Sequence, residues 1–486
     1  MGLSPETALA VAAFGPLVTA ALVALLGRWP NVREAATMVT SLGIFGVVAT
    51  VLWPAVRAGE RPHLHLVEVM DGLDLAFTLE PLGLLFALVA TSLWPITSLY
   101  AVGYLRGHGE INQTRFFICF ALAIAGALGV AFSANLFTLF IFYEAITLST
   151  FPLVTHKGDE NSMRSGRIYL GILMSTSICL LLFAVVWTQI AAGTTDFRVG
   201  GILGDLPAKY VPILLGLFAF GTAKAALMPF HRWLPAAMVA PTPVSALLHA
   251  VAVVKAGVFT ITKVVVYTFG LDVLRATEAS GWLVAVAAFT LLSSSIVALY
   301  QDNLKRRLAY STISQLAYIV LGAALLSDRA VLGAGLHIAT HAYGKITLFF
   351  CAGAIMVGAH RKKVSQLDGL GWRMPFTFGA FLVGSLSIIG IPPFAGAWSK
   401  WWLAGGALEA DYLPILALYM ISSLLAVGYL MPVVARAFGT RPPVDPEDHV
   451  REPLLCVLPP VITAAGCLAL FFGVDPIVAL LEGMLR

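Results

Sequence analysis

Charged side chains are scarce in this chain. Only 12% of its 486 residues are Asp, Glu, Lys or Arg, whereas 59% are apolar. An ordinary soluble domain carries about 25% charged residues, so this composition excludes a soluble enzyme. Apolar runs of about 20 residues, the length that crosses a hydrocarbon core of ~30 Å, recur along the chain. The sequence therefore predicts an all-α polytopic membrane protein.

Motifs for disulfides, metals and nucleotides are also missing. The five cysteines have no C-x-x-C spacing and lie in apolar runs, so we interpret them as small core residues and expect no metal centre. No G-x-G-x-x-G motif follows a predicted strand, and no cysteine ligand set is present. We therefore expect no cofactor. The net charge of +4 is too small to favour nucleic acid as a partner.

Apolar runs between polar breaks predict about fourteen transmembrane helices. Their ranges are 6–27, 36–56, 78–105, 116–132, 134–155, 168–191, 210–230, 241–270, 281–300, 308–326, 330–358, 374–406, 411–435 and 452–482. The first run lacks a small-residue cleavage site, so we interpret it as a retained helix. Most Lys and Arg residues, Arg441 among them, fall in loops after odd-numbered spans. By the positive-inside rule these loops are cytoplasmic, and both termini face away from the cytoplasm.

One outer loop has the pattern of a β-hairpin. Residues 63–79 alternate polar and apolar side chains on both sides of Asp71-Gly72, and an Asp-Gly pair in this setting is a strong signal for a two-residue turn. We expect a hairpin on the outer surface. His63 and His65 lie on its first strand, and we interpret them as part of a solvated face, with a metal site as the alternative.

Ionisable residues inside the predicted spans need an explanation, because a charge at the bilayer centre costs about 2.5–3.5 kcal/mol on insertion scales. Glu144 is the one carboxylate well inside a span, and Glu80 lies at the edge of the third. We interpret Lys263, near a span end, as a structural residue whose ammonium reaches the interface. Function is the default hypothesis for the other lysines within spans: Lys224, Lys255, Lys345 and Lys400.

Histidines accompany two of these lysines. His337, His341 and Lys345 are spaced four residues apart, which places all three on one face of a helix. His249 shares the eighth span with Lys255. A lone histidine in a membrane helix is often only a hydrogen-bonded core residue, so His249 by itself leaves both interpretations open. The three-residue stripe favours function, because a single helix exposes three polar groups along one face.

Two of the lysine-bearing spans also contain helix breakers. Lys224 precedes Pro229, and Lys400 follows Pro392 and Pro393. A proline inside a helix removes a backbone donor and clashes with the carbonyl four residues back. We therefore expect two discontinuous helices, with a simple proline kink as the alternative. Interrupted spans at matching places in two halves of a transporter point to an ion or substrate path.

Four motifs in this order resemble the antiporter-like subunit family: GTAKAALMPFHRWLPAAMVAPTPVSALLHA at 221–250, DNLKRRLAYSTISQLAYI at 302–319, HIATHAYGKITLF at 337–349, and DGLGWRMPFTF…GSLSIIGIPPFAGAWSK within 368–400. The family is shared by respiratory complex I, Mrp-type multisubunit Na⁺/H⁺ antiporters, among which the D-type component is the most similar, and membrane-bound hydrogenases. The resemblance covers about residues 75–435. The segment 143–158 favours the Mrp and hydrogenase branch.

The resemblance implies a fold and a set of site residues. An N-terminal unit of three helices in 1–110 would precede two inverted five-helix repeats in 111–275 and 276–436, and a C-terminal helix would lie in 437–486. Each repeat would hold one discontinuous helix. The family's polar positions fall on Glu144, Lys224, His249, Lys255, His337, His341, Lys345 and Lys400. Two departures are Glu80 in place of a familiar aspartate and Tyr143 in place of a frequent tryptophan.

These residues suggest a proton path. A nearby carboxylate favours a charged lysine and desolvation disfavours it, so Glu144 and Lys224 are expected to act as a switchable pair. The proton would pass through Lys255 and His249 to the stripe and then to Lys400, with waters between the groups. The implied partners are protons, possibly Na⁺, the lipid bilayer and other membrane subunits in a cell inner (plasma) membrane.

Two alternatives to a proton-translocating subunit stay open at this point. One is a quinone-reactive membrane subunit of a respiratory enzyme, which would need a redox centre of its own or in a partner. The other is a free-standing transporter of an organic solute. The chain itself carries no recognisable catalytic chemistry, so it would act as part of a translocase. Whether redox chemistry or an ion gradient supplies the energy is also open.

Overall fold

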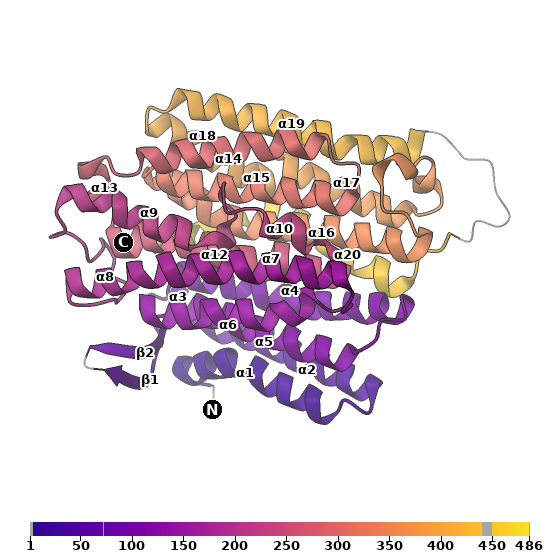
Figure 1. Cartoon of the computed structure of the whole chain (residues 1–486), viewed down its shortest axis with the longest axis horizontal. Helices are drawn as coiled ribbons and strands as arrows, with labels where there is room; N and C mark the ends of the chain where they lie inside the picture. Colours follow the sequence, from indigo (N-terminus) through magenta and orange to yellow (C-terminus); the bar gives the residue numbers. More distant parts are fainter. Residues whose placement is uncertain (1–2, 71, 440–449, 486) are drawn as a thin grey trace.

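The protein is a bundle of long helices that lie side by side (Figure 1). The computed structural model describes residues 3–70, 72–439 and 450–485. Two residues used above, Asp71 of the expected hairpin turn and Arg441 of a basic loop, lie outside this part of the chain. The hairpin and the two chain ends lie toward the left of Figure 1.

The first half of the chain forms helices at the predicted positions. They are α1 (Pro5–Leu25), α2 (Pro30–Val47) continuing into α3 (Trp53–Arg57), α4 (Pro81–Gly107), α5 (Gln113–Phe132), α6 (Leu136–Val154), α7 (Glu160–Thr176) continuing into α8 (Leu182–Ala192), α9 (Val211–Gly221), α10 (Trp233–Ala236), and α11 (Thr242–Ala246) continuing into α12 (Val253–Lys263). Short π-helical turns connect the continued pairs, at Val48–Leu52, Ser177–Leu181 and Leu247–Val251.

The second half is also helical. Its helices are α13 (Leu271–Thr277), α14 (Gly281–Leu299), α15 (Leu304–Ala324), α16 (Asp328–Ala359), α17 (Pro375–Ile389), α18 (Gly396–Glu409), α19 (Leu413–Gly439), α20 (Leu454–Phe472) and α21 (Val474–Glu482). Among the described residues, eleven helices are long and apolar enough to cross a membrane. The prediction of a multi-pass helical membrane protein is confirmed, and the count of fourteen stays a prediction.

Both predicted interruptions are present. Helix α9 ends at Gly221, a short 3-10 turn holds Lys224, and Ala226 has a left-handed backbone with φ of 55° before α10 begins. Helix α17 ends at Ile389, and Gly390 with φ of 93° ends it before α18 starts at Gly396. Close packing surrounds the first break, because a Cβ on Gly257 of α12 would overlap the backbone of Ala225.

The predicted hairpin is confirmed. Strand β1 (His63–Met70) pairs antiparallel with β2 (Leu73–Thr78), and His63 lies opposite Thr78. The Asn135 amide donates to the backbone carbonyl of Asp74 at 2.8 Å, while its side-chain oxygen accepts from the backbone N–H of Thr138 at 2.8 Å and caps α6. One side chain thus starts α6 and fixes the hairpin against it.

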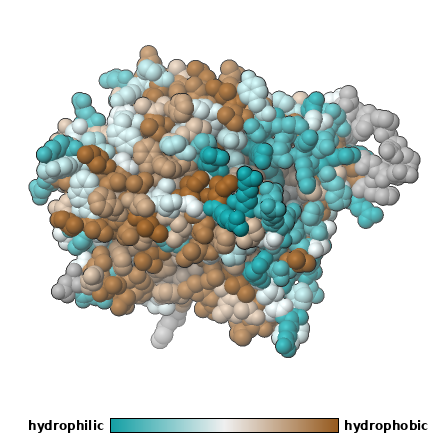
Figure 2. Space-filling view, viewed as in Figure 1, coloured by the Kyte–Doolittle hydropathy of each residue, from teal (hydrophilic) through white to brown (hydrophobic). Residues whose placement is uncertain are grey.

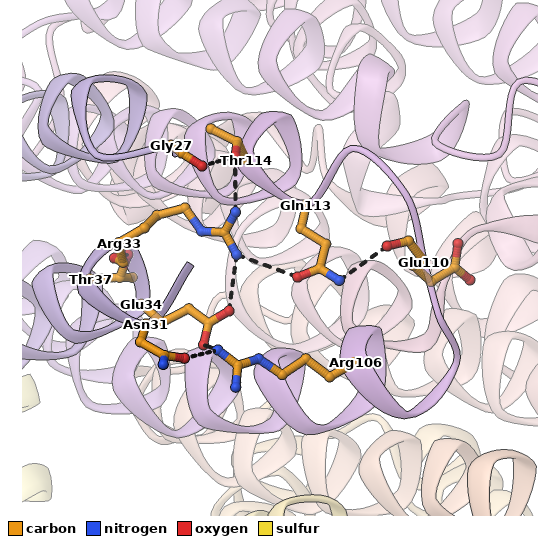
Figure 3. A network of polar contacts seen from close by, with 9 residues as sticks. All are labelled: Gly27, Asn31, Arg33, Glu34, Thr37, Arg106, Glu110, Gln113 and Thr114. Atoms are coloured by element: carbon orange, nitrogen blue, oxygen red, sulfur yellow. Dashed lines mark hydrogen bonds and ion pairs between the residues drawn. The ribbon is translucent and has the colours of Figure 1, made fainter. Parts of the chain in front are cut away.

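A buried charge network joins the N-terminal helices to the rest of the bundle (Figure 3). Glu34 on α2 accepts from Arg33 at 2.9 Å and from Arg106 of α4 at 2.5 Å. Arg33 also donates to the Thr114 hydroxyl of α5 at 2.9 Å and to the Gln113 amide oxygen at 3.4 Å. Arg33 and Glu34 are both buried. The basic residues that indicated topology in the sequence therefore also anchor three helices.

The cysteine interpretation is right for three residues and wrong for one. Cys351, Cys456 and Cys467 are buried and Cys119 is half-buried, but Cys179 is exposed. Cys179 lies on the π-helical turn between α7 and α8, and its side chain points away from the bundle rather than into it. The outer surface there is apolar in character, because brown hydrophobic residues cover much of the middle and left of Figure 2, while hydrophilic residues gather toward the right.

Candidate functional site

The lysine of the first interrupted helix is fully buried. The Lys224 ammonium donates to the Tyr143 carbonyl at 2.8 Å and to the Thr147 hydroxyl at 2.7 Å. It also lies 3.2 Å from the centroid of the Tyr143 ring. The break makes this position possible, because the 3-10 turn directs the side chain toward α6 instead of along a continuous helix. Neutral oxygens and an aromatic face therefore solvate this cation.

Glu144 follows Tyr143 on α6, yet it is not bonded to Lys224. Both Glu144 carboxylate oxygens are buried and have no hydrogen-bond partner in the described structure. The residues expected to act as a pair are therefore neighbours on facing elements without a direct ion pair among the described contacts. A buried carboxylate without a donor is costly, so it needs water or a moving cation as its partner.

A direct contact links the two halves of the chain. Lys255 Nζ on α12 lies 2.6 Å from His341 Nδ1 on α16, and both side chains are buried. We expected water between all of these groups, and for this step that expectation is wrong. A hydrogen bond between an amine and an imidazole is a connection along which one proton can move in either direction.

The remainder of the stripe on α16 faces α15 and α18. The His337 ring stacks near His341, with centroids 5.8 Å apart. His337 Nε2 lies 3.2 Å from Gln315 Oε1, and its Nδ1 lies 2.8 Å from the Ser399 hydroxyl. Because an amide oxygen only accepts, Nε2 carries the hydrogen and the Ser399 hydroxyl donates to Nδ1. His337 is thus oriented toward the residue that precedes Lys400.

Lys345 and His249 lie to one side of this line. Lys345 donates to the Ser311 hydroxyl of α15 at 2.5 Å. His249 packs on Phe349 with ring centroids 4.5 Å apart, and both of its ring nitrogens are buried without a partner in the described structure. Lys345 therefore continues the stripe predicted from the four-residue spacing. His249 is placed beside the stripe, but no direct bond joins it to Lys255.

The lysine of the second interrupted helix has surroundings similar to those of the first. Lys400 donates to the Ile389 carbonyl at 3.0 Å, at the end of α17, and to the Ser423 hydroxyl of α19 at 2.9 Å. Its ammonium lies 4.8 Å from the centroid of the Tyr318 ring. Helix breaks thus place both lysines, Lys224 and Lys400, against free carbonyl and hydroxyl oxygens and a tyrosine ring.

Lys263 corrects the sequence interpretation. Its ammonium does not reach the interface, because the side chain is fully buried in an ion pair with Glu80. It also donates to the Ser133 carbonyl at 2.6 Å and lies 4.2 Å from the centroid of the Phe197 ring. The Glu80 side chain is 12% exposed. The pair fixes α12 to the start of α4, next to the hairpin.

Several polar neighbours were not singled out from the sequence: Tyr143, Thr147, Ser311, Gln315, Tyr318, Ser399 and Ser423. Hydroxyl residues are common in membrane helices, so their presence alone carries little information. Gln315 gave the clearest signal, because a large amide in an apolar span needs a buried partner. Within the part of the chain that the structure describes, no group of three His, Cys, Asp or Glu side chains is arranged to hold a metal ion.

The fold and the buried groups define a class: a multi-pass helical membrane protein that keeps a row of titratable side chains in its interior. The family model described as NADH:quinone oxidoreductase/Mrp antiporter, TM, matches residues 133–426. The chain belongs to this family, as the four motifs indicated.

Characterised relatives come from both branches of the family. NADH-quinone oxidoreductase subunit N of Desulforudis audaxviator is 34% identical over 76% of this chain and 77% of its own length. The A/B component of a probable K⁺/H⁺ antiporter of Rhizobium meliloti is 31% identical over 84% of this chain but only 41% of its own length. For that relative the match spans less than half of the protein.

Solved structures share the fold over nearly the whole chain. A chain of the Mrp complex from Dietzia sp. superposes with a TM-score of 0.82, covering 98% of this chain and 97% of that one. A chain of the membrane-bound sulfane sulfur reductase, an archaeal respiratory membrane complex, gives a TM-score of 0.86 with 98% of each chain covered. Sequence identity is 22% in both cases, so these likenesses concern the fold.

Proposed function

We propose that this chain is the proton-translocating subunit of a multisubunit membrane complex. The relatives named above are subunits of a quinone oxidoreductase and of an antiporter, and both structural matches are chains of larger membrane complexes. Other membrane subunits would be the partners and would supply the energy. The distribution of basic loop residues supports a cell inner membrane location with both termini outside the cytoplasm.

The contact between Lys255 and His341 carries this proposal. A protonated Lys255 would transfer H⁺ from Nζ to His341 Nδ1, leaving a neutral amine and an imidazole that can release H⁺ from Nε2. Helix α12 belongs to the proposed first repeat (111–275) and α16 to the second (276–436), so one hydrogen bond of 2.6 Å joins the two repeats. From His341 the path would continue through His337 and Ser399 to Lys400, with Lys345 and His249 as neighbouring titratable groups.

The start of the path is proposed as a moving pair. Lys224 now donates to the Tyr143 carbonyl and to Thr147, and the Glu144 carboxylate has no partner. A change in the Lys224 side-chain rotamer toward Glu144 would form an ion pair, and the return would break it. Because a carboxylate favours the ammonium form, this motion would bind and release the proton that then passes to Lys255.

Proton movement by the reconstituted complex tests the proposal. The complex that co-purifies with this chain is placed in liposomes with an internal pH dye. Lys255→Met is expected to abolish H⁺ movement with all subunits still assembled, because the link to His341 is lost. Lys209→Met is the control, since Lys209 is exposed and outside the row. Near-normal H⁺ movement with Lys255→Met would refute the path, and organic solute uptake by the chain alone would favour a free-standing transporter.

A further inference from the structure

A basic cavity of about 530 Å³ opens at the end of the bundle where α7 and α15 begin and α16 ends. It lies away from the buried row described above. Six cationic side chains line it: Lys157, Arg164, Lys305, Arg306, Arg361 and Lys362. They come from three loops far apart in sequence, so the fold itself brings these charges together.

The cavity has almost no negative charge to balance these cations. Asp159 is the one carboxylate among its lining residues, and that carboxylate already accepts from the backbone N–H of Ser162 at 2.7 Å as the N-cap of α7. In the part of the chain described here, none of the six cations has a recorded ion pair with a carboxylate. Converging unpaired charges of one sign repel one another and attract an anion.

The repulsion is visible at Lys305, which precedes the predicted span 308–326. Its ammonium is half-buried and donates to the Ala240 carbonyl at 2.6 Å. Burial, and then the positive charges of Lys157 and Lys362, lower the pKa of Lys305 to about 7. An anion in the cavity would offset this repulsion and favour the charged lysine.

We propose that this cavity binds a phosphate group, of the kind that an anionic phospholipid headgroup carries. Basic pockets between helices at the membrane surface are typical sites for such headgroups. The lining also includes the apolar side chains of Ile168, Met238 and Met356, which can pack against the glycerol and the first carbons of an acyl chain. Soluble phosphate has the same chemistry, so the experiment must separate the two sources. The proposal does not depend on the proton path.

Two double variants test the site with equal changes of net charge. Arg164→Gln/Lys362→Gln removes two lining cations. Arg167→Gln/Lys363→Gln removes two neighbouring cations that do not line the cavity. The intact complex is placed in nanodiscs of phosphatidylcholine with increasing phosphatidylglycerol, and retained lipid is counted by native mass spectrometry. At about 1 kcal/mol per cation, the first variant is expected to weaken phosphatidylglycerol retention about 30-fold, and the second to leave it unchanged.

Further arms decide the source and the sign. Binding is expected to be tighter at pH 6 than at pH 8, because Lys305 is then charged, and 10 mM inorganic phosphate at roughly physiological salt should not displace the lipid. Displacement by phosphate alone would overturn the lipid assignment in favour of a soluble anion. Equal retention by both double variants would overturn the site. Loss of a co-purifying subunit from the first variant, with lipid retention unchanged, would assign the cavity to a protein partner instead.

Discussion

Replacing Lys263 by methionine is expected to destabilise the protein strongly. The ammonium is fully buried, pairs with Glu80 and donates to the Ser133 carbonyl at 2.6 Å. Methionine fills a similar volume but leaves the Glu80 carboxylate, only 12% exposed, without its cation. Removing one partner of a buried ion pair costs about 3–5 kcal/mol. We expect about 3 kcal/mol here, because Glu80 keeps some contact with water.

The assay is unfolding of the assembled complex in mild detergent, followed by tryptophan fluorescence as denaturant is added. Lys263→Met/Glu80→Gln is expected to recover most of the loss, because no charge is then left unpaired, and the double-mutant cycle isolates the pair. Lys209→Met serves as the exposed control. A Lys263→Met protein within about 0.5 kcal/mol of the wild type would refute the buried pair and restore the interpretation that this lysine reaches the interface.

Two further changes test the packing around the site. Gly257→Ala is expected to cost about 1–3 kcal/mol, because the new Cβ would overlap the backbone of Ala225 beside Lys224; Gly171→Ala, with open space around it, is the control, and equal unfolding midpoints would contradict the close approach. Glu34→Ala is expected to cost about 3 kcal/mol by leaving the buried Arg33 without a carboxylate; Glu6→Ala is the exposed control, and unchanged stability would show that the network in Figure 3 is not an anchor.

Sequence patterns sufficed for the elements because each depends on local chemistry. Apolar runs, the two proline-bearing breaks and the alternation around the hairpin turn are all properties of contiguous residues, and the structure contains the corresponding helices, interruptions and strands. The stripe on α16 was also visible, because a spacing of four residues fixes the face of a helix.

Contacts between distant segments were not visible in the sequence. Lys263 was assigned to the interface because its carboxylate partner, Glu80, lies on another element and only the packing of α12 against the start of α4 brings them together. The expected pair of Glu144 and Lys224 failed for a related reason. Proximity on facing elements does not determine which acceptor a long side chain chooses, and the Tyr143 carbonyl and Thr147 are chosen here.

The partners of the buried lysines separate two kinds of residue. Lys224, Lys345 and Lys400 donate to neutral hydroxyl or carbonyl oxygens, and Lys255 contacts an imidazole, whereas Lys263 is held by a carboxylate. A carboxylate stabilises the charged form and opposes release of its proton, and neutral oxygens do so much less. The lysines with neutral partners are therefore suited to transfer, and Lys263 is suited to hold the fold together.

Arginine substitutions test this division, because a guanidinium keeps its charge but cannot be deprotonated in a protein. Lys263→Arg is expected to preserve both stability and H⁺ movement, since a permanent cation still pairs with Glu80. Lys400→Arg is expected to abolish H⁺ movement while the complex stays assembled, since the proton cannot leave. Both are measured in the same liposomes. Retained H⁺ movement with Lys400→Arg would mean that Lys400 acts only as a fixed charge, and its loss with Lys263→Arg would make Lys263 part of the path.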